Sequence, residues 1–444
     1  LMQIISIIKV RKLFLLGGFV LFMNSAVIAQ EKSEISLNQA IEKARVNNRG
    51  LKLSQKEMDV ARAQYESSRA VLLPQLRVTN TSTFTNNPLH AFGFKLLQKD
   101  VEAADFDPDL LNDPGNVENF NTRLELIQPL INIDGWKERK SANLQFEISQ
   151  LQSERTDEYV ELEVTKTFMQ LQLAYKMVKV YEKANETASE NQKWAKSYLE
   201  EGLMQNADFL LIKVHQSDIE NKLFRAKTQV EDVSEYLSFL IGDKSDQVLL
   251  PTGELELHVN DANPTISLNE NRKDLLALEL SVQAQENMLG SSKMKFVPRA
   301  NAVANYEWND NQFMGFGADN YLVGIQLSWD LFSGYKNIGK IHKEKALLEK
   351  ASLEQEKYKA ESEIELNKAK RKFEDSKNLL VLSNLALEQS KEALRITSNR
   401  FKQGLEKSKD LLLAETLFQE KELEYHRSVF DHNFTLAYLK FLTR

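Results

Sequence analysis

The sequence has 444 residues, of which 27% are charged, carries a net charge of −7, and contains 16 Gly, 8 Pro and no Cys. The few glycines and prolines predict long helices with few breaks, and the length allows more than one ordinary domain. The lack of Cys excludes a disulfide scaffold, Cys-ligated zinc and an acylated N-terminal cysteine, and the negative charge argues against a nucleic-acid partner.

Residues 1–29 have the features of a secretory signal peptide. Three basic residues within positions 9–12 precede an apolar run over 13–23, and small residues lead up to Ala29, so we expect cleavage before Gln30. A membrane anchor is the weaker alternative, because the apolar run is too short to span a bilayer. No later stretch is long and apolar enough for a transmembrane helix. The exported chain is therefore expected to be periplasmic, secreted or an outer-membrane β-barrel.

The first half of the mature chain, residues 30–242, is predicted to form a helix, a β-hairpin over 75–128 and two more helices. Ser36 can cap the first helix, which Leu73-Pro74 ends. The expected elements are a helix over 36–73, a strand over 75–85, a loop over 86–118, a strand over 119–128, a long helix over about 137–199 and a helix over about 208–241. The loop is unusually long, so we expect it to be exposed and functional, or mobile.

One motif occurs twice, once in each half of the chain. The stretch Y-L-E-E-G-L-M-Q-N-A-D-F-L-L begins at Tyr198 and R-F-K-Q-G-L-E-K-S-K-D-L-L-L at Arg400, which aligns Gly202 with Gly404, Leu203 with Leu405 and Asp208 with Asp410. Each Gly follows a helical run, as a left-handed C-terminal cap does. Each Asp opens the next run, as an N-cap or a first-turn acid does. The two stretches, 198–208 and 400–410, are therefore predicted to be hairpin tips of a duplicated chain.

The second half repeats the plan after a linker over 243–271. Val297-Pro298 ends its first helix, as Leu73-Pro74 does in the first half. The expected elements of this repeat, residues 272–444, are a helix over 272–296, a hairpin over 300–329 with strands at 300–309 and 321–329, a long helix over about 335–401 and a helix over 410–442.

The second long helix carries a strict seven-residue repeat. Its large members are Leu366, Phe373, Leu380, Leu387, Leu394 and Phe401, and its small members are Ala369, Ser376, Ser383, Ser390 and Thr397. A sustained period of seven predicts left-handed supercoiling, and the small positions let a neighbouring helix approach closely.

Four strands in two hairpins cannot close a membrane barrel, since natural barrels begin at about eight strands. An open sheet edge cannot face lipid, so strands would have to be pooled between chains. Four aromatic residues near the strand ends fit the girdles of such a barrel: Tyr306, Trp308, Tyr321 and Trp329. The alternative is an ordinary half-buried sheet of a soluble domain.

The chain resembles the TolC-type outer membrane efflux proteins over nearly its whole mature length. The motifs that carry the resemblance are S-L-N-Q-A-I-E-K-A-R-V-N-N at 36–48, the two helix ends before proline, W-D-L-F-S-G at 329–334, and both tips. The resemblance implies a mainly α fold with a small β part. In that fold, antiparallel coiled-coil helices form a periplasmic α-barrel, and four strands per chain contribute to a trimeric twelve-stranded β-barrel in the outer membrane.

The resemblance also implies partners and tip residues. The partners are two further copies of the chain, a periplasmic adaptor, an inner-membrane transporter and outer-membrane lipid. Contacts to the adaptor are expected at Gly202, Leu203, Gly404 and Leu405. The chain is then a passive exit duct of a tripartite efflux pump or a type I secretion system. The runner-up is a soluble periplasmic coiled-coil structural or adaptor protein.

The predicted aperture residues are Asp208, Arg400, Phe401, Glu406 and Asp410. In the family, an acid like Asp208 joins a closing network with Tyr and Arg side chains of the other tip. Here Phe401 stands where the hydroxyl is usual and Glu406 where a cation is usual. Only Arg400 remains as a donor, so we predict a weakly latched resting state. The alternative role of the two aspartates is helix capping.

The sequence contains no recognisable catalytic, cofactor or metal-binding motif. Its six histidines lack metal-ligand spacing, and it has no phosphate-binding Gly loop or nucleophile motif. We therefore expect no enzyme activity and no cofactor. The cargo, the class of the transporter, the resting state and the role of loop 86–118 cannot be read from the sequence.

Overall fold

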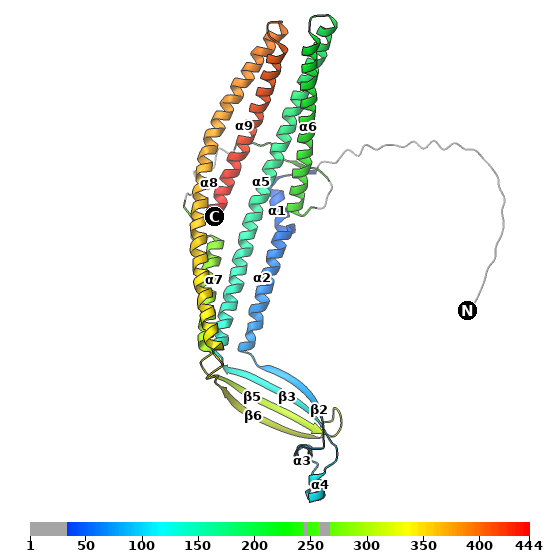
Figure 1. Ribbon diagram of the computed structural model, residues 1–444, viewed down its shortest axis with the longest axis vertical. Helices are drawn as coiled ribbons and strands as arrows, with labels where there is room; N and C mark the ends of the chain where they lie inside the picture. Colours follow the sequence, from blue (N-terminus) through cyan, green and yellow to red (C-terminus); the bar gives the residue numbers. More distant parts are fainter. Residues whose placement is uncertain (1–32, 244–246, 258–266) are drawn as a thin grey trace, which may run out of the picture.

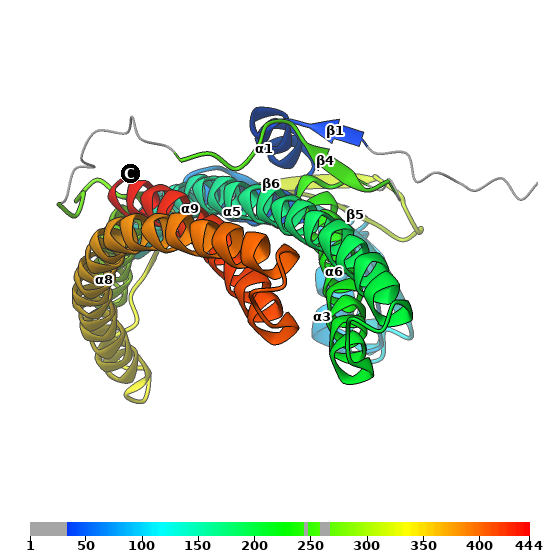
Figure 2. The same cartoon turned by 90° about the horizontal axis from the view of Figure 1, so that it is seen from above.

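The structure is a computed structural model that describes residues 33–243, 247–257 and 267–444. The signal peptide predicted over 1–29 lies outside the described residues, and so does part of the 243–271 linker. A long curved layer of helices stands on a four-stranded sheet (Figure 1), and the view along the layer shows its concave and convex sides (Figure 2).

The helices form two repeats with the same plan. In the first, α1 (Leu37–Asn47) and α2 (Arg49–Ser67) lie beside the long α5 (Ile133–Glu200), which returns as α6 (Asn206–Ile241). In the second, α7 (Lys273–Met294) lies beside the long α8 (Lys336–Lys402), which returns as α9 (Ser408–Thr443). With 68 and 67 residues, α5 and α8 are each about 100 Å long. The predicted duplication is confirmed, since each repeat has one long helix with shorter helices beside it.

The expected single helix over 36–73 is wrong, because Asn48 breaks it. Asn48 has an extended ψ of 128°, ends α1 and caps α2 by accepting a hydrogen bond from the Leu51 amide. Its side-chain amide donates at 2.8 Å to the Leu240 carbonyl near the end of α6. Asparagine offers the backbone such an alternative to helical bonding. A short 3-10 turn, Ser68–Val71, completes this segment before the strand.

The sheet has the strand order β2-β3-β5-β6 and is entirely antiparallel. Its strands are β2 (Gln75–Thr85), β3 (Val117–Ile131), β5 (Arg299–Asp310) and β6 (Ala318–Ser328). The predicted hairpins are confirmed, although β3 begins two residues earlier and ends three residues later than expected, and β6 begins three residues earlier. Trp329 falls just outside β6, contrary to the predicted strand over 321–329.

The expected irregular loop over 86–118 contains two α-helices and a 3-10 turn. These are α3 (Pro88–Leu97), the turn Ala103–Phe106 and α4 (Pro108–Asn112). Asn87 caps α3 and Asp107 caps α4, and each is followed by proline at the first helical position. A capping residue followed by proline is a known start of a helix. Both helices could therefore have been predicted from the sequence, although the Asn-, Asp-, Gly- and Pro-rich composition favoured a loop.

Part of the 243–271 linker belongs to the fold. Its β4 (Leu249–Pro251) pairs in parallel with β1 (Ser33–Ile35), on the convex side of the helical layer (Figure 2). Leu249 and Ile35 join the largest apolar cluster, where they pack with residues of α1, α5 and α6. The linker thereby ties the start of the described chain to the middle of the helical layer.

The predicted heptad seam is the buried face of α8. Leu366, Ala369, Phe373 and the three seam serines are all buried. Two of the serines bond across to α9: Ser376 Oγ lies 3.1 Å from His432 Nδ1, and Ser383 Oγ lies 2.8 Å from Ser428 Oγ. The small seam residues therefore let α9 approach and also supply polar contacts that fix its register.

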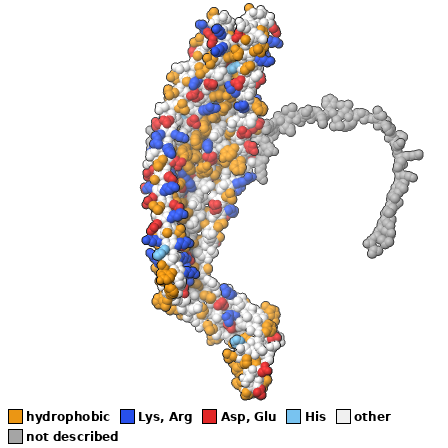
Figure 3. Space-filling view, viewed as in Figure 1, with side chains coloured by type: hydrophobic (Ala, Val, Ile, Leu, Met, Phe, Trp, Pro, Cys, Tyr) orange, Lys and Arg blue, Asp and Glu red, His pale blue; other side chains and the backbone are white. Residues whose placement is uncertain are grey.

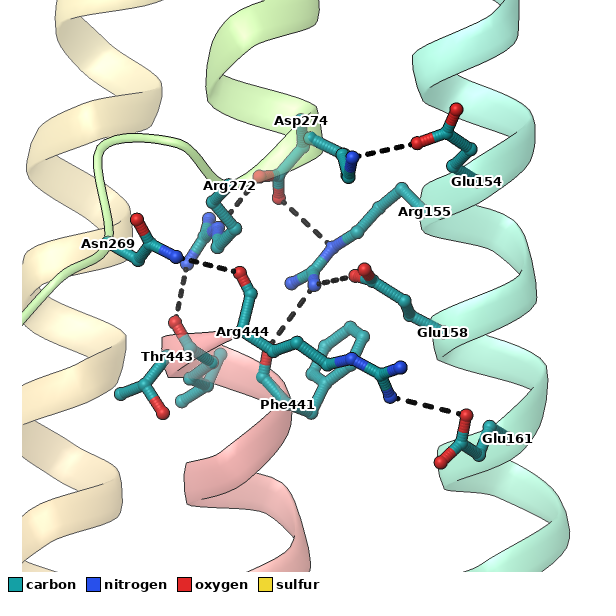
Figure 4. Close-up of polar contacts among 12 residues, drawn as sticks. Glu154, Arg155, Glu158, Glu161, Asn269, Arg272, Asp274, Phe441, Thr443 and Arg444 are labelled. Carbon is teal, nitrogen blue, oxygen red and sulfur yellow. Dashed lines mark hydrogen bonds and ion pairs between the residues drawn. The ribbon is translucent and has the colours of Figure 1, made fainter. Parts of the chain in front are cut away.

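In each repeat, the helix that returns from the tip (α6 or α9) ends where a helix nearer the sheet (α2 or α7) begins, and this joint lies beside a long helix. In the second repeat the end of α9 meets the start of α7 beside α5 (Figure 4). Arg272, only 2% exposed, donates to the Leu442 carbonyl at 3.4 Å, to Ser362 Oγ at 2.7 Å and to Asp274 at 2.7 Å. Asn48 makes the corresponding contact of the first repeat, so the two N-cap residues of α2 and α7 hold the last turns of α6 and α9.

Arg155 of α5 strengthens this junction. It donates to the Phe441 carbonyl at 3.2 Å, bonds Glu158 at 2.7 Å and lies 3.7 Å above the Phe441 ring (Figure 4). Burial alone would raise the pKa of the Asp274 carboxyl, but hydrogen bonds from Arg272 and Tyr358 and the charge of Arg155 outweigh it, so that pKa lies below its ordinary value. The junction fixes the level at which both helical tips stand.

Candidate functional site

The two faces of the sheet differ sharply in chemistry. Cross-strand partners put one set of apolar side chains on the same face, each between 66% and 75% exposed: Leu76, Val78, Val323, Ile325 and Leu327. The opposite face is polar. There Arg123 pairs with Glu307 at 2.6 Å, and Asn121 donates to Glu307 and to Asn309. We call the first surface the apolar sheet face; water is an unfavourable neighbour for so large an exposed patch.

The predicted girdle residues lie at both ends of this face. Tyr306 and Tyr321 are cross-strand partners near the loop end, where the Trp308 and Tyr306 rings are in tilted contact, with centroids 4.7 Å apart. Trp329 lies at the helix end and donates from Nε1 to the Phe296 carbonyl at 2.8 Å. The stretch from Tyr321 to Trp329, all of it in β6 except Trp329, is roughly 26 Å long, which is comparable to the apolar band of a membrane barrel. Their role as a girdle stays a prediction.

Both edges of the sheet lack a partner strand among the described residues. The edge strands are β2 and β6, which are 11 residues long each. Long uncovered edges present rows of free N–H and C=O groups that pair readily with another strand. The sheet is therefore shaped to continue into neighbouring sheets.

Each helical tip is closed by a Schellman motif. At the first, the Gly202 amide donates to the Leu199 carbonyl and the Leu203 amide to the Tyr198 carbonyl; Gly202 has φ +75°. At the second, the Gly404 amide donates to the Phe401 carbonyl, and Gly404 has φ +71°. This bond pattern and the left-handed glycine confirm the predicted C-terminal caps.

Both tip leucines point into solvent. Leu203 is 67% exposed and Leu405 is 63% exposed. Each belongs to the short turn between two helices, α5 and α6 for Leu203 and α8 and α9 for Leu405; Figure 1 shows these two turns at the end of the molecule away from the sheet. Such a position suits a contact with another protein, and the role in adaptor binding remains a prediction.

The two tip aspartates are first-turn acids and do not cap their helices. The N-cap residues are Gln205 and Lys407, neither of which makes a side-chain cap bond, and Asp208 and Asp410 lie further on in the first turn. N-capping, one of the two sequence expectations for these acids, is therefore wrong. Both side chains are half-buried, and a carboxylate in the first turn still interacts favourably with the helix dipole.

The other predicted aperture residues do not form one cluster with the aspartates. Arg400 Nε pairs with Glu406 Oε2 at 2.9 Å within the same tip. Phe401 is buried, 7% exposed, and packs on Trp194 with centroids 5.0 Å apart. Glu406, which stands where a cation is usual in the family, therefore has the one remaining donor, Arg400, as its partner. Arg400 is engaged within its own hairpin and is not shown to bridge the two tips.

A polar contact between the hairpins lies deeper than the tips. Buried Glu415 of α9 accepts from Asn191 Nδ2 of α5 at 2.6 Å and lies 3.4 Å from His215 Nε2 of α6. Sequence reasoning missed this group, although Glu415 lies only five residues after the second tip. Its one signal was a charged residue on the side of α9 that also carries Leu411 and Leu423, both of which are buried.

A groove of about 990 Å³ opens between α5, α8 and α9. Along α9 it is lined by an aromatic row, with centroids 6.0 Å apart for Phe430–Phe434 and 6.1 Å for Phe434–Tyr438. Lys166 lies 5.7 Å from the Phe434 centroid. α9 also contacts the 247–257 segment, where Asn433 donates to the Glu256 carbonyl. Figure 3 shows hydrophobic side chains gathered midway along the helices.

A sequence profile described as outer membrane efflux protein matches residues 40–243 and 267–427. These two segments correspond to the two structural repeats and cover most of the chain. The chain belongs to the outer membrane efflux protein family. A search among curated proteins returns no match.

Solved structures of outer-membrane channels share the fold of this efflux-family chain. The CmeC outer membrane channel of Campylobacter jejuni superposes with a TM-score of 0.80 at 14% identity, covering 92% of this chain and 85% of that one. The outer membrane protein VceC of Vibrio cholerae gives 0.76 at 15% identity, with 91% and 95% covered. The MtrE outer membrane channel of Neisseria gonorrhoeae, in its open state, gives 0.75 at 16% identity, with 92% and 88% covered. At these identities the likeness shows the fold.

Two properties of the described residues concern membrane-spanning helices and metal binding. No described helix is both long and apolar enough to cross a membrane. Among the same residues, no three His, Asp or Glu side chains are placed to hold a metal ion.

Proposed function

We propose that three copies of the chain assemble into an outer-membrane exit duct of a tripartite efflux pump or a type I secretion system. The observation that carries this proposal is the sheet: one face exposes apolar side chains, the other is polar, and both edges are open. Three such sheets, joined edge to edge, give a closed barrel of twelve strands with no free edge. Closure satisfies every backbone group, which a lipid environment demands.

The helical layer supports the same proposal. Its curvature (Figure 2) allows three layers to enclose a tunnel, whose wall would be the concave side. In this arrangement the sheet lies in the outer membrane and the helices extend through the periplasm. The two tips, about 100 Å from the sheet, would meet a periplasmic adaptor and an inner-membrane transporter through their exposed leucines. The duct supplies a path and its partners supply the energy, so no catalytic group is required.

The runner-up, a soluble periplasmic coiled-coil protein, would leave the apolar sheet face in water. The mass of the purified protein separates the two functions. We expect the detergent-extracted protein to have the mass of three mature chains and to dissociate into monomers on heating. After insertion into a planar bilayer it should conduct ions. A monomer that stays soluble without detergent would contradict the duct and favour the runner-up.

A further inference from the structure

Exposed apolar and aromatic side chains surround the point where the helices meet the sheet. At the turn from β6 into α8 they are Trp329, Leu331, Phe332 and Tyr335, which are between 58% and 76% exposed. Phe296, at the turn from α7 into β5, is 40% exposed. These residues extend the apolar sheet face toward the helices. They therefore have to lie in the same apolar environment as that face.

Basic side chains follow immediately on the helical side. Lys336, Lys340 and Lys343 occupy one stripe of α8, spaced by four and three positions. Lys295 follows the last residue of α7, and its interaction with the nearby ammonium of Lys340, together with partial burial, lowers the pKa of the Lys295 ammonium. We call these four lysines and the exposed residues 329–335 the junction collar. Figure 3 shows blue and orange side chains together at this level.

Most acids near the collar are engaged or buried. Asp134 is held by Arg299 through two bonds, Glu138 lies 4.0 Å from Lys295, and Glu344, the first acid of α8, is buried. Asp330 is exposed and lies near the Arg299 guanidinium. Ammonium groups that lie close together repel each other, and an anion beside them relieves this repulsion.

We propose that the junction collar binds the phosphate headgroups of anionic phospholipids in the membrane leaflet that faces the helices. Aromatic side chains followed by lysines are the order found where a protein leaves the hydrocarbon layer, because the rings favour the headgroup level and lysines extend toward phosphates. The charge of the collar is complementary to an anionic headgroup, and its apolar half is continuous with the apolar sheet face. This inference rests on the proposed function, since it needs the sheet to lie in a membrane.

The collar has a matched control on the same helix. Lys350, Lys357 and Lys359 also lie on α8, are exposed, and form only surface ion pairs with glutamates. They stand about 10 to 20 Å further from the sheet, beyond the level of a headgroup. Replacing three lysines at either place removes the same charge from the same helix.

The test compares the wild type, a collar variant (Lys336→Gln, Lys340→Gln, Lys343→Gln) and a control variant (Lys350→Gln, Lys357→Gln, Lys359→Gln). Each purified complex is titrated with phosphatidylglycerol or phosphatidylcholine of identical acyl chains, and bound lipids are counted by native mass spectrometry. We expect the wild type and the control variant to prefer phosphatidylglycerol. The collar variant should lose about tenfold or more of that preference, since each lysine near an anionic surface contributes roughly fivefold.

Equal binding of the two lipids by the wild type, or an unchanged preference in the collar variant, would overturn the proposal. A collar variant that no longer forms the trimer would assign the lysines to contacts between copies, which also overturns it. The same spectra and a conductance measurement report on the proposed function separately. A conducting trimer without lipid preference refutes only the collar, whereas a monomer that does not conduct refutes the duct.

Discussion

The two repeats have the same hydrogen-bond plan but different side chains. Asn48 and Arg272 occupy the N-cap positions of α2 and α7, and their acceptors, Leu240 and Leu442, occupy the last turns of α6 and α9. The first junction is a neutral amide bond, whereas the second is a buried guanidinium with several partners. The two repeats are therefore joined at the same place by different chemistry, and we expect the two joints to differ in strength.

The largest expected effect is at the charged joint. Arg272→Ala should lower the free energy of unfolding by about 3 to 5 kcal/mol, because it removes a buried cation together with its bonds to Asp274, the Leu442 carbonyl and Ser362. Asn48→Ala should cost about 1 to 3 kcal/mol, since it removes a neutral donor and a helix cap. Urea unfolding of each variant in the same detergent measures both losses.

A surface arginine provides the control for this comparison. Arg444 is 59% exposed in its side chain and pairs with Glu161 at 3.3 Å, so Arg444→Ala should cost no more than about 1 kcal/mol. Equal losses for Arg272→Ala and Asn48→Ala would show that the two joints are equally strong. The pH dependence adds a check. The folded-state pKa of Asp274 is depressed, so its stabilising contribution is complete above the ordinary aspartate pKa and is lost as pH falls through the depressed value.

The tip acids test whether the repeats differ in function as well. If Asp410 supplies three carboxylates around the axis of a trimer, a trivalent cation such as cobalt hexammine added from the periplasmic side should block current, and Asp410→Asn should remove the block. Asp208→Asn, at the equivalent position of the first repeat, is the matched variant. Neither residue caps its helix, so each change costs only the dipole interaction, about 0.3 to 1 kcal/mol.

Bilayer conductance with and without cobalt hexammine distinguishes the two acids. Loss of block in one variant alone would assign the aperture to that repeat. Equal block in the wild type and in both variants would remove these acids from the aperture.

The smallest expected effect is at Arg400. Its contact is to Glu406 in the same tip, so Arg400→Ala should raise basal conductance little, because no bond between hairpins is lost. The matched change is Glu415→Gln, which weakens the contact among α5, α6 and α9 and should raise conductance more. A large rise with Arg400→Ala, measured under the same voltage and salt, would show that Arg400 holds the tips together after all.

Much of the fold was predictable because it depends on local signals. Proline after a helix, glycine at a tip and alternation in a strand each act within a few residues, and the bounds of β2 and the tips followed from them. The break at Asn48 was missed because its cause is a contact with Leu240, distant in sequence. The helices in 86–118 were missed because the composition of the loop outweighed the capping signals at Asn87 and Asp107.

The candidate site was predicted less completely. Exposure of Leu203 and Leu405 follows from the tip motif alone. In contrast, the burial of Phe401 depends on Trp194 from the other hairpin, and the pairing of Arg400 with Glu406 depends on the path of the chain around Gly404. Neither partner is identified by a spacing within one helix. Contacts between separate hairpins are the part of this molecule that sequence patterns do not specify.

The end-to-end joints constrain where this chain can change in length. Each long helix runs without interruption past a joint between two shorter helices. An insertion in α6 alone would push its last turn past Asn48 and separate the two partners of the first joint. A longer or shorter helical layer therefore requires matched insertions on both arms of a hairpin, in whole heptads where the seam of α8 packs on α9. The positions of the two joints thus set how the helical layer can gain or lose length.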